Sequence, residues 1–285
     1  MMKLVIVANE KGGCRKTAVT TVIADAALAS GQPVQIFQVD RQGRLPVLFR
    51  GLVATIAMPS TETLRQDDLA DAVALAPLDD ALRDSASRLV LVEIGANLPS
   101  RVADCIAAAE TGTFLAQSGT EVTIVVPTTT DPEAITLGCR TLRQLREAFP
   151  GARALVCLCQ DGASWEEITN SKAREAYDEQ LSPLITAGEF FRLPRLLPRA
   201  LAALDASALT PLGFARLSDT DLLAVTHLPG AVARHVRGDI AKYVYDAVAS
   251  LQKVLPFRDA SEVGSAPARR SRSAPTRRGV DDGEK

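Results

Sequence analysis

The segment of residues 9–17, near the amino terminus, constrains the fold of this chain more than any other stretch. It reads Asn-Glu-Lys-Gly-Gly-Cys-Arg-Lys-Thr, follows the apolar run 3–8 and precedes a helix-like stretch at 18–29. This order of strand, glycine turn, lysine, hydroxyl and helix is typical of loops that hold the phosphates of a nucleotide. In such a loop the backbone N–H groups turn inward, and the end of the helix adds partial positive charge. We therefore expect Lys16 to reach the terminal phosphates and Thr17 to offer its hydroxyl to Mg²⁺. The alternative is an ordinary strand-to-helix turn with solvated lysines.

Apolar runs alternate with helical stretches along most of the chain. We expect buried parallel strands at residues 4–8, 34–39, 89–94, 122–126 and 154–159, and a sixth strand at 189–193. This alternation predicts an α/β fold with a doubly wound, mostly parallel sheet flanked by helices. Helices are expected at 18–29, from Asp131 onward and at 237–255. The acidic region 61–87 is expected to be helical and to lie over one edge of the sheet.

Composition limits the class of protein and the surfaces that it can offer. The chain has 285 residues, of which 47% are apolar and 23% charged, so it can bury a sizeable core. Its net charge is −2, so any contact with nucleic acid must come from a local basic patch. The five cysteines lack the spacing of a zinc site, and their odd number fits a reducing compartment. No apolar run approaches the roughly 20 residues that span a bilayer, and the chain enters its first strand without a targeting segment. We expect a cytoplasmic protein.

The character of the sequence changes near its carboxyl terminus. Residues 264–280 contain five arginines, with serines, alanines and two prolines but no acid. Such a segment has too little apolar content to fold alone. We therefore expect a nucleotide-binding domain at 1–258 and a flexible basic tail, containing arginine, serine and proline, at 259–285.

The lysines and glycines of the amino-terminal loop follow an unusual pattern. The ordinary phosphate loop, G-x-x-x-x-G-K-[ST], is not met, whereas K-G-G-x-x-K-[ST] is supplied by Lys11, Gly12, Gly13, Lys16 and Thr17. This deviant Walker A pattern resembles the ParA/MinD family of dimerising P-loop ATPases, and more closely its ParA plasmid-partition branch. The resemblance implies ATP and Mg²⁺ as cofactors, with the whole loop, including Cys14 and Arg15, around the phosphates. It also implies that Lys11 reaches across a nucleotide-sandwich homodimer to the partner's ATP.

Further motifs of the family can be matched after three later strands. By the resemblance, Asp40 in Asp40-Arg41-Gln42-Gly43 orients the attacking water, although an aspartate there could also simply close a strand. In the stretch Leu89–Asn97, the resemblance implies that Glu93 holds a magnesium-bound water and that the Gly95 amide senses the γ-phosphate. The alternative for Glu93 is an exposed acid at a strand end. Gln160 could contact the adenine, or be a turn residue. The catalytic residues predicted are thus Lys11, Lys16 and Asp40, and the metal residues are Thr17 and Glu93.

Three positions depart from the family pattern and bear on activity. Arg15 stands where glycine is usual, so that it either adds a phosphate contact or blocks the pocket. Gln38 replaces an aspartate, and Glu93 stands where aspartate is usual. Together they predict slow, partner-stimulated ATP hydrolysis, or a degenerate scaffold that binds nucleotide without turning it over. A third hypothesis for the function is a ligase of the dethiobiotin synthetase kind, and Lys11 argues against it.

The implied role is an ATP-dependent dimer switch in plasmid or chromosome partition, or in maintenance or transfer of a mobile element. Such a protein needs an adaptor that stimulates hydrolysis and a positive surface for non-specific DNA. The basic candidates are the tail arginines and Arg192, Arg195, Arg199, Arg234, Arg237 and Lys242. A solvated arginine face is the alternative. Membrane docking is not expected, because no large apolar residue follows Phe257.

Overall fold

The computed structural model describes residues 2–40, 43–84, 88–160 and 170–257. Its centre is a seven-stranded sheet in which every neighbouring pair is parallel, ordered β3-β2-β4-β1-β5-β6-β7. The strands are β1 (Lys3–Ala8), β2 (Val34–Val39), β3 (Val53–Ile56), β4 (Leu89–Ile94), β5 (Glu121–Thr128), β6 (Arg153–Cys159) and β7 (Phe190–Leu193). The predicted doubly wound α/β fold is therefore confirmed, with β3 as an edge strand that we did not predict.

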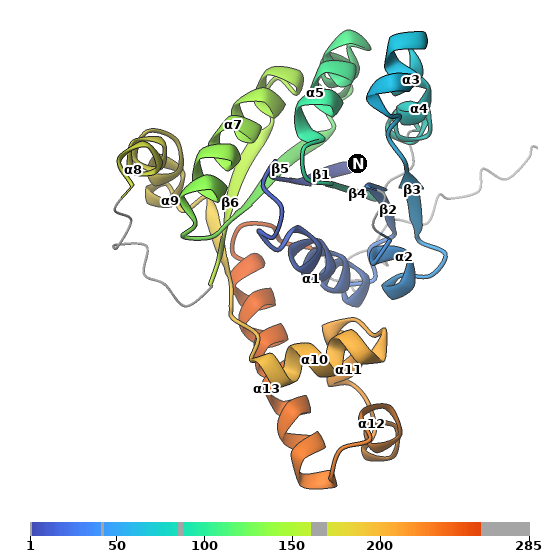
Figure 1. The fold of residues 1–285 in the computed structure, drawn as a ribbon, viewed down its shortest axis with the longest axis vertical. Coiled ribbons are helices and arrows are strands. Elements are labelled where there is room, and N and C mark those ends of the chain that lie inside the picture. The colour runs from blue at the N-terminus through green and yellow to red at the C-terminus, as the bar shows by residue number, and fades with distance from the viewer. Residues whose placement is uncertain (1, 41–42, 85–87, 161–169, 258–285) are drawn as a thin grey trace, which may run out of the picture.

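Helices cover both faces of this sheet (Figure 1). They are α1 (Lys16–Ala29), α2 (Leu45–Leu48), α3 (Thr61–Gln66), α4 (Ala70–Arg83), α5 (Pro99–Ala108), α6 (Thr111–Gln117), α7 (Pro132–Ala148), α8 (Ser171–Ala176), α9 (Ser182–Thr186), α10 (Pro198–Ser207), α11 (Pro211–Ala215), α12 (Asp219–Thr226) and α13 (Gly230–Leu251). A single π-helical turn, η2 (Tyr177–Leu181), joins α8 to α9. The last helix thus begins seven residues earlier than predicted.

Alternating strand residues divide the core into two layers. On β1, Val5 and Val7 pack with α1 and α13, whereas Leu4 and Ile6 pack with α4, α5 and α7 on the other face. The expected helices of region 61–87 are α3 and α4. The buried residues of α4 share a core layer with Ile56 of the edge strand β3 and with Leu4 and Ile6 of β1. The apolar residues of α4 follow helical spacing, so they pack against a face of the sheet.

The order of the strands fixes where a ligand can bind. β1 lies between β4 and β5, so the chain proceeds to opposite sides of the sheet from this central strand. The loops at the carboxyl ends of β1 and its neighbours border the crevice that open α/β sheets use for ligands. Figure 1 also shows α12 and the amino-terminal half of α13 extending away from the sheet, below α10 and α11.

Candidate functional site

The loop between β1 and α1 contains two residues with a positive φ. Gly13 has a φ of 79° and Arg15 a φ of 65°, both in the left-handed region. Glycine adopts this region freely, whereas arginine does so only at a cost. Gly12 has no such constraint, since an added Cβ would meet only the Ala96 Cβ at 3.9 Å.

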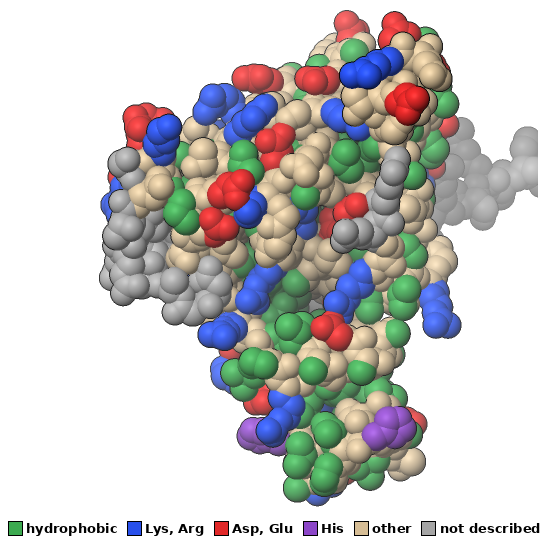
Figure 2. All heavy atoms as spheres, viewed as in Figure 1, with side chains coloured by type: hydrophobic (Ala, Val, Ile, Leu, Met, Phe, Trp, Pro, Cys, Tyr) green, Lys and Arg blue, Asp and Glu red, His purple; other side chains and the backbone are tan. Residues whose placement is uncertain are grey.

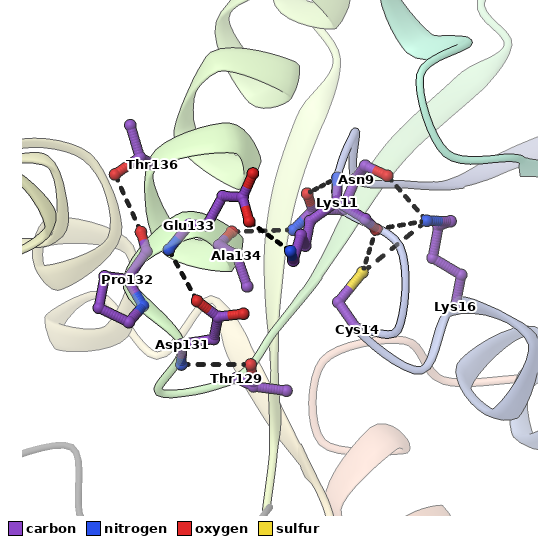
Figure 3. Close-up of polar contacts among 10 residues, drawn as sticks. All are labelled: Asn9, Lys11, Cys14, Lys16, Thr129, Asp131, Pro132, Glu133, Ala134 and Thr136. Atoms are coloured by element: carbon purple, nitrogen blue, oxygen red, sulfur yellow. Dashed lines mark hydrogen bonds and ion pairs between the residues drawn. The ribbon is translucent and has the colours of Figure 1, made fainter.

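The Lys16 side chain turns back into this loop (Figure 3). Its Nζ donates to the Asn9 and Lys11 carbonyl oxygens at 2.8 Å each, and the Cys14 Sγ lies 3.9 Å away. Only 9% of Lys16 is exposed. Lys16 also stands at the amino-terminal end of α1, where partial positive charge favours an anion.

Asn9 anchors the loop to the neighbouring elements. Its Nδ2 donates to the carbonyls of Pro127 at 2.9 Å and Ala134 at 3.0 Å, and its Oδ1 accepts from the Lys11 N–H at 2.9 Å. Gly138 on α7 makes room for this amide, because a Cβ there would stand 2.9 Å from Asn9 Nδ2. The sequence analysis did not identify this anchor. Its signal was an amide side chain at a strand end, which is common at turns.

Lys11 points away from Lys16, toward the start of α7 (Figure 3). Its Nζ forms an ion pair with the Glu133 carboxylate, and the hydrogen bond that Lys11 donates to Glu133 raises the pKa of Lys11 above its usual value. Glu133 is placed by a helix start in which the Asp131 side chain accepts from the Glu133 N–H at 2.9 Å, with Pro132 at the first turn. Lys11 therefore forms its ion pair with a residue of its own chain.

A buried polar corner lies where α1, β2 and β4 meet. Glu93 Oε1 accepts from the Thr17 hydroxyl at 2.9 Å and from Gln38 Nε2 at 3.3 Å. Glu93 is 2% exposed, so the alternative of an exposed acid at a strand end is wrong. Burial raises the pKa of Glu93, although hydrogen bonds from Thr20, Thr17 and Gln38 act in the opposite direction.

This corner fits a magnesium ion. Glu93 Oε2 and Gln38 Oε1 are both buried without a hydrogen-bond partner. Carboxylate, amide and hydroxyl oxygens are the hard ligands that Mg²⁺ takes, and a cation or its bound water would satisfy both unpaired oxygens. Thr17 and Glu93, the predicted metal residues, are thus brought together, with Gln38 added to them.

Asp40 and Gly95 also meet at this end of the sheet. A Cβ on Gly95 would lie 2.8 Å from Asp40 Oδ2 and 3.0 Å from the Val39 carbonyl oxygen, so glycine is required for their approach. The Gly95 N–H, expected to sense a γ-phosphate, donates to that Val39 carbonyl at 2.8 Å. Arg41 and Gln42 lie outside the described residues, and so do Asp161 and Gly162.

An apolar cavity of about 110 Å³ lies on the other side of the loop. It is lined by Thr17, Ala18, Thr21, Arg44, Leu48, Leu196, Leu201, Leu204, Leu209, Pro211 and Tyr243. Leu196 belongs to the proline-containing stretch after β7. Gln160 is not part of this lining: its side chain is exposed and its N–H donates to the Leu193 carbonyl at 2.9 Å. The predicted contact between Gln160 and the adenine stays a prediction.

The basic residues predicted to contact DNA are partly neutralised. Arg237 pairs with Asp219 at 2.9 Å and Arg234 with the same acid at 3.8 Å, while Lys242 pairs with Asp246 at 2.7 Å. Arg192 lies over the Phe190 ring. In Figure 2, blue and red side chains are interspersed over the visible face. The tail arginines lie outside the described residues.

Two cysteines, Cys157 and Cys159, are fully buried on β6. Within the described ranges, no group of three or more His, Cys, Asp or Glu side chains is arranged to hold a metal ion. None of the helices in the same ranges combines the length and apolar content needed to cross a bilayer.

The architecture is similar to that of several solved structures. MinD with Mg-ADP from Pyrococcus horikoshii is 15% identical, with 88% of this chain and 99% of that chain covered at a TM-score of 0.43. An McdA–ATP complex from Cyanothece is 13% identical, with coverages of 90% and 97% and a TM-score of 0.40. The pNOB8 ParA bound to nonspecific DNA is 16% identical, with coverages of 86% and 99% and a TM-score of 0.39.

The sequence matches no protein-family model and no curated protein. The likeness to these solved structures concerns the fold alone.

Proposed function

We propose that this chain is a ParA-like ATPase that binds Mg·ATP at the loop between β1 and α1 and hydrolyses it slowly. The observation that carries the proposal is the buried Lys16 ammonium inside a glycine turn, at the end of a helix and beside a polar corner with two unpaired oxygens. The two unpaired oxygens have a cost in a protein without a ligand, which a bound cation relieves, and the Lys16 ammonium lies beside them, where it can also reach phosphate oxygens.

We propose a role for each residue of the site. Lys16 and the backbone of residues 12–15 bind the phosphates, and the apolar cavity beside Ala18 receives the nucleoside end. Thr17 and Glu93 hold Mg²⁺, which when bound neutralises charge on the phosphate oxygens. Asp40 places the attacking water, since positioning is most of what phosphoryl transfer requires of the protein.

Lys11 gives the proposal its second part, an ATP-dependent homodimer. In one subunit this lysine pairs with Glu133, and to contact the partner's nucleotide it must leave that pair. We infer that dimer formation acts in DNA partition or in maintenance or transfer of a mobile element, with an adaptor that stimulates hydrolysis. Because Arg234, Arg237 and Lys242 face acids, we assign non-specific DNA contact mainly to the basic tail at 259–285.

Sedimentation velocity with Mg·AMPPNP, Mg·ADP or no nucleotide tests this function. We expect a dimer only with AMPPNP in the wild type and a monomer in Lys11→Ala, which should still bind nucleotide. Lys242→Ala removes an exposed lysine elsewhere and should behave as wild type. A Lys11→Ala protein that dimerises normally would contradict the role in trans.

A second candidate is a scaffold that binds nucleotide without significant hydrolysis. The left-handed Arg15 favours it, because an arginine at this position crowds a loop where glycine is usual. Phosphate release under single-turnover conditions separates the two: a wild-type rate no faster than that of Asp40→Ala would favour the scaffold.

A further inference from the structure

Glu10 connects the loop between β1 and α1 to two other elements of the site. It directly follows the anchor residue Asn9, and only 9% of it is exposed. Its N–H donates to the Thr141 hydroxyl on α7 at 3.1 Å, and a carboxylate oxygen lies 3.8 Å from Arg140 Nε on the same helix. A buried carboxylate is costly unless other groups bond to it, so the partners of Glu10 bear on the energy of the loop.

The segment 95–100, which leads from β4 into α5, binds Glu10 from another side. The Asn97 N–H donates to the Glu10 carbonyl oxygen at 3.2 Å, with Asn97 in the left-handed region at a φ of 62°. The Ser100 hydroxyl, in the first turn of α5, donates to a Glu10 carboxylate oxygen. Backbone and side chain of one loop residue are thus both bonded to this short segment.

The same segment contains Gly95, whose N–H is expected to sense a γ-phosphate. In the structure that N–H donates to the Val39 carbonyl oxygen at 2.8 Å, so it is not available to a phosphate. To face a ligand in the loop, the Gly95 N–H must leave Val39, and the bonds from Asn97 and Ser100 to Glu10 resist that movement. The contacts of Glu10 therefore favour the observed position of the segment.

We propose that Glu10 is a positioning residue that, through its bond from Ser100, holds the Gly95 N–H away from the γ-phosphate. A carboxylate suits this task, because a hydrogen bond to a charged acceptor is stronger than one between neutral groups. When the bond is broken, the segment shifts toward the position that a triphosphate prefers, whereas a diphosphate gains nothing from the shift. This inference rests on the proposed function and assigns to Glu10 a part in the choice between the two nucleotides.

Substitutions on both sides of the bond test the proposal. Ser100→Ala removes the donor, Ser100→Thr keeps a hydroxyl, and Glu10→Gln keeps an acceptor oxygen without the charge. The matched control Ser118→Ala removes a hydroxyl that donates to the Leu115 carbonyl at the end of α6. Affinities for Mg·ADP and Mg·AMPPNP are measured by calorimetry, and the unfolding midpoint is measured without nucleotide.

We expect Ser100→Ala to raise the ratio of AMPPNP affinity to ADP affinity about tenfold, because losing a hydrogen bond to a charged group shifts an equilibrium by about that factor. Glu10→Gln should raise the ratio by a smaller factor, and Ser100→Thr and Ser118→Ala should keep the wild-type ratio. General damage to the fold does not produce a selective gain in triphosphate affinity. The ratio therefore separates positioning from a structural role.

An unchanged or lowered ratio in Ser100→Ala would overturn the inference, and together with a lower unfolding midpoint it would show that the bond only stabilises the fold. An equal rise in Ser118→Ala would overturn it as well, because that hydroxyl does not contact Glu10. Failure of the wild type to bind either nucleotide would instead refute the proposed function, and this inference with it.

Discussion

Asp25 gives a sharp prediction about how this fold responds to pH. This carboxylate lies in α1, is 7% exposed, and accepts the Leu212 N–H at 3.1 Å at the start of α11. Burial raises its pKa from 3.8 to about 6, against hydrogen bonds from Thr210 and Leu212 and the charge of Arg216. Above the unfolded pKa, the folded state therefore retains a proton that the unfolded state has lost.

The sign and size of the effect follow by linkage. Because the folded state binds more protons, stability falls as the pH rises, and the loss is complete above a pH of about 6. Each pKa unit is worth about 1.4 kcal/mol, so the ionised Asp25 lowers the free energy of unfolding by about 3 kcal/mol at pH 8. At pH 5 the same linkage gives about 1.5 kcal/mol.

Asp25→Asn removes this titration and keeps an oxygen for the Leu212 N–H. Urea unfolding of both proteins between pH 5 and 8 isolates Asp25, since other groups cancel in the difference. We expect the variant to gain about 1.5 kcal/mol relative to wild type across this range. A difference that is constant with pH, or that moves the other way, would show that Arg216 and the α11 terminus outweigh burial.

Three further changes test other parts of the site. Gly95→Ala places a Cβ 2.8 Å from Asp40 Oδ2 and so displaces this carboxylate. Because a misplacement of about 1 Å can slow a reaction on the order of 100-fold, we expect turnover at least about tenfold slower, with nucleotide affinity nearly unchanged. An unaltered phosphate-release rate would argue against the role of Asp40 in placing the water. Glu133→Gln removes the ion pair between Lys11 and Glu133 of the same chain. More dimer should then form at a given AMPPNP concentration, as measured by sedimentation. An unchanged dimer fraction would show that this ion pair does not compete with dimer formation. Asn9→Ala removes the two hydrogen bonds that its Nδ2 donates to the Pro127 and Ala134 carbonyls and should lower the free energy of unfolding in urea by about 2 kcal/mol. A loss under about 0.5 kcal/mol would show that Asn9 is not the anchor.

The sheet was predictable because its central strands are buried on both sides. Runs such as 89–94 and 154–159 are almost wholly apolar, which is typical of parallel strands covered by helices. β3 escaped prediction because Val53–Ile56 is a four-residue edge strand with a threonine, and short apolar runs do not distinguish strand from helix. The start of α13 was missed because Gly230 is a poor helix former, although packing of Ala233 and Val236 extends the helix to it.

The site was predictable where one motif contains its residues. Lys16 and Thr17 follow from their spacing to the glycines, and Glu93 and Asp40 from their place at strand ends. Contacts between segments far apart in the chain were not predictable. The pairing of Lys11 with Glu133 spans 122 residues, and the bond from Asn9 to Ala134 spans 125. Such contacts depend on the crossover that places α7 beside the loop.

The central claim is that the loop between β1 and α1 binds a nucleotide's phosphates with Lys16 at its centre. Calorimetric titration of Mg·ATP into the wild type and into Lys16→Met tests this claim most directly, with circular dichroism to verify that the variant is folded. We predict saturable binding of one nucleotide per chain in the wild type, and at least about 100-fold weaker binding in Lys16→Met. No heat of binding in the wild type, or equal affinity in the two proteins, would contradict it.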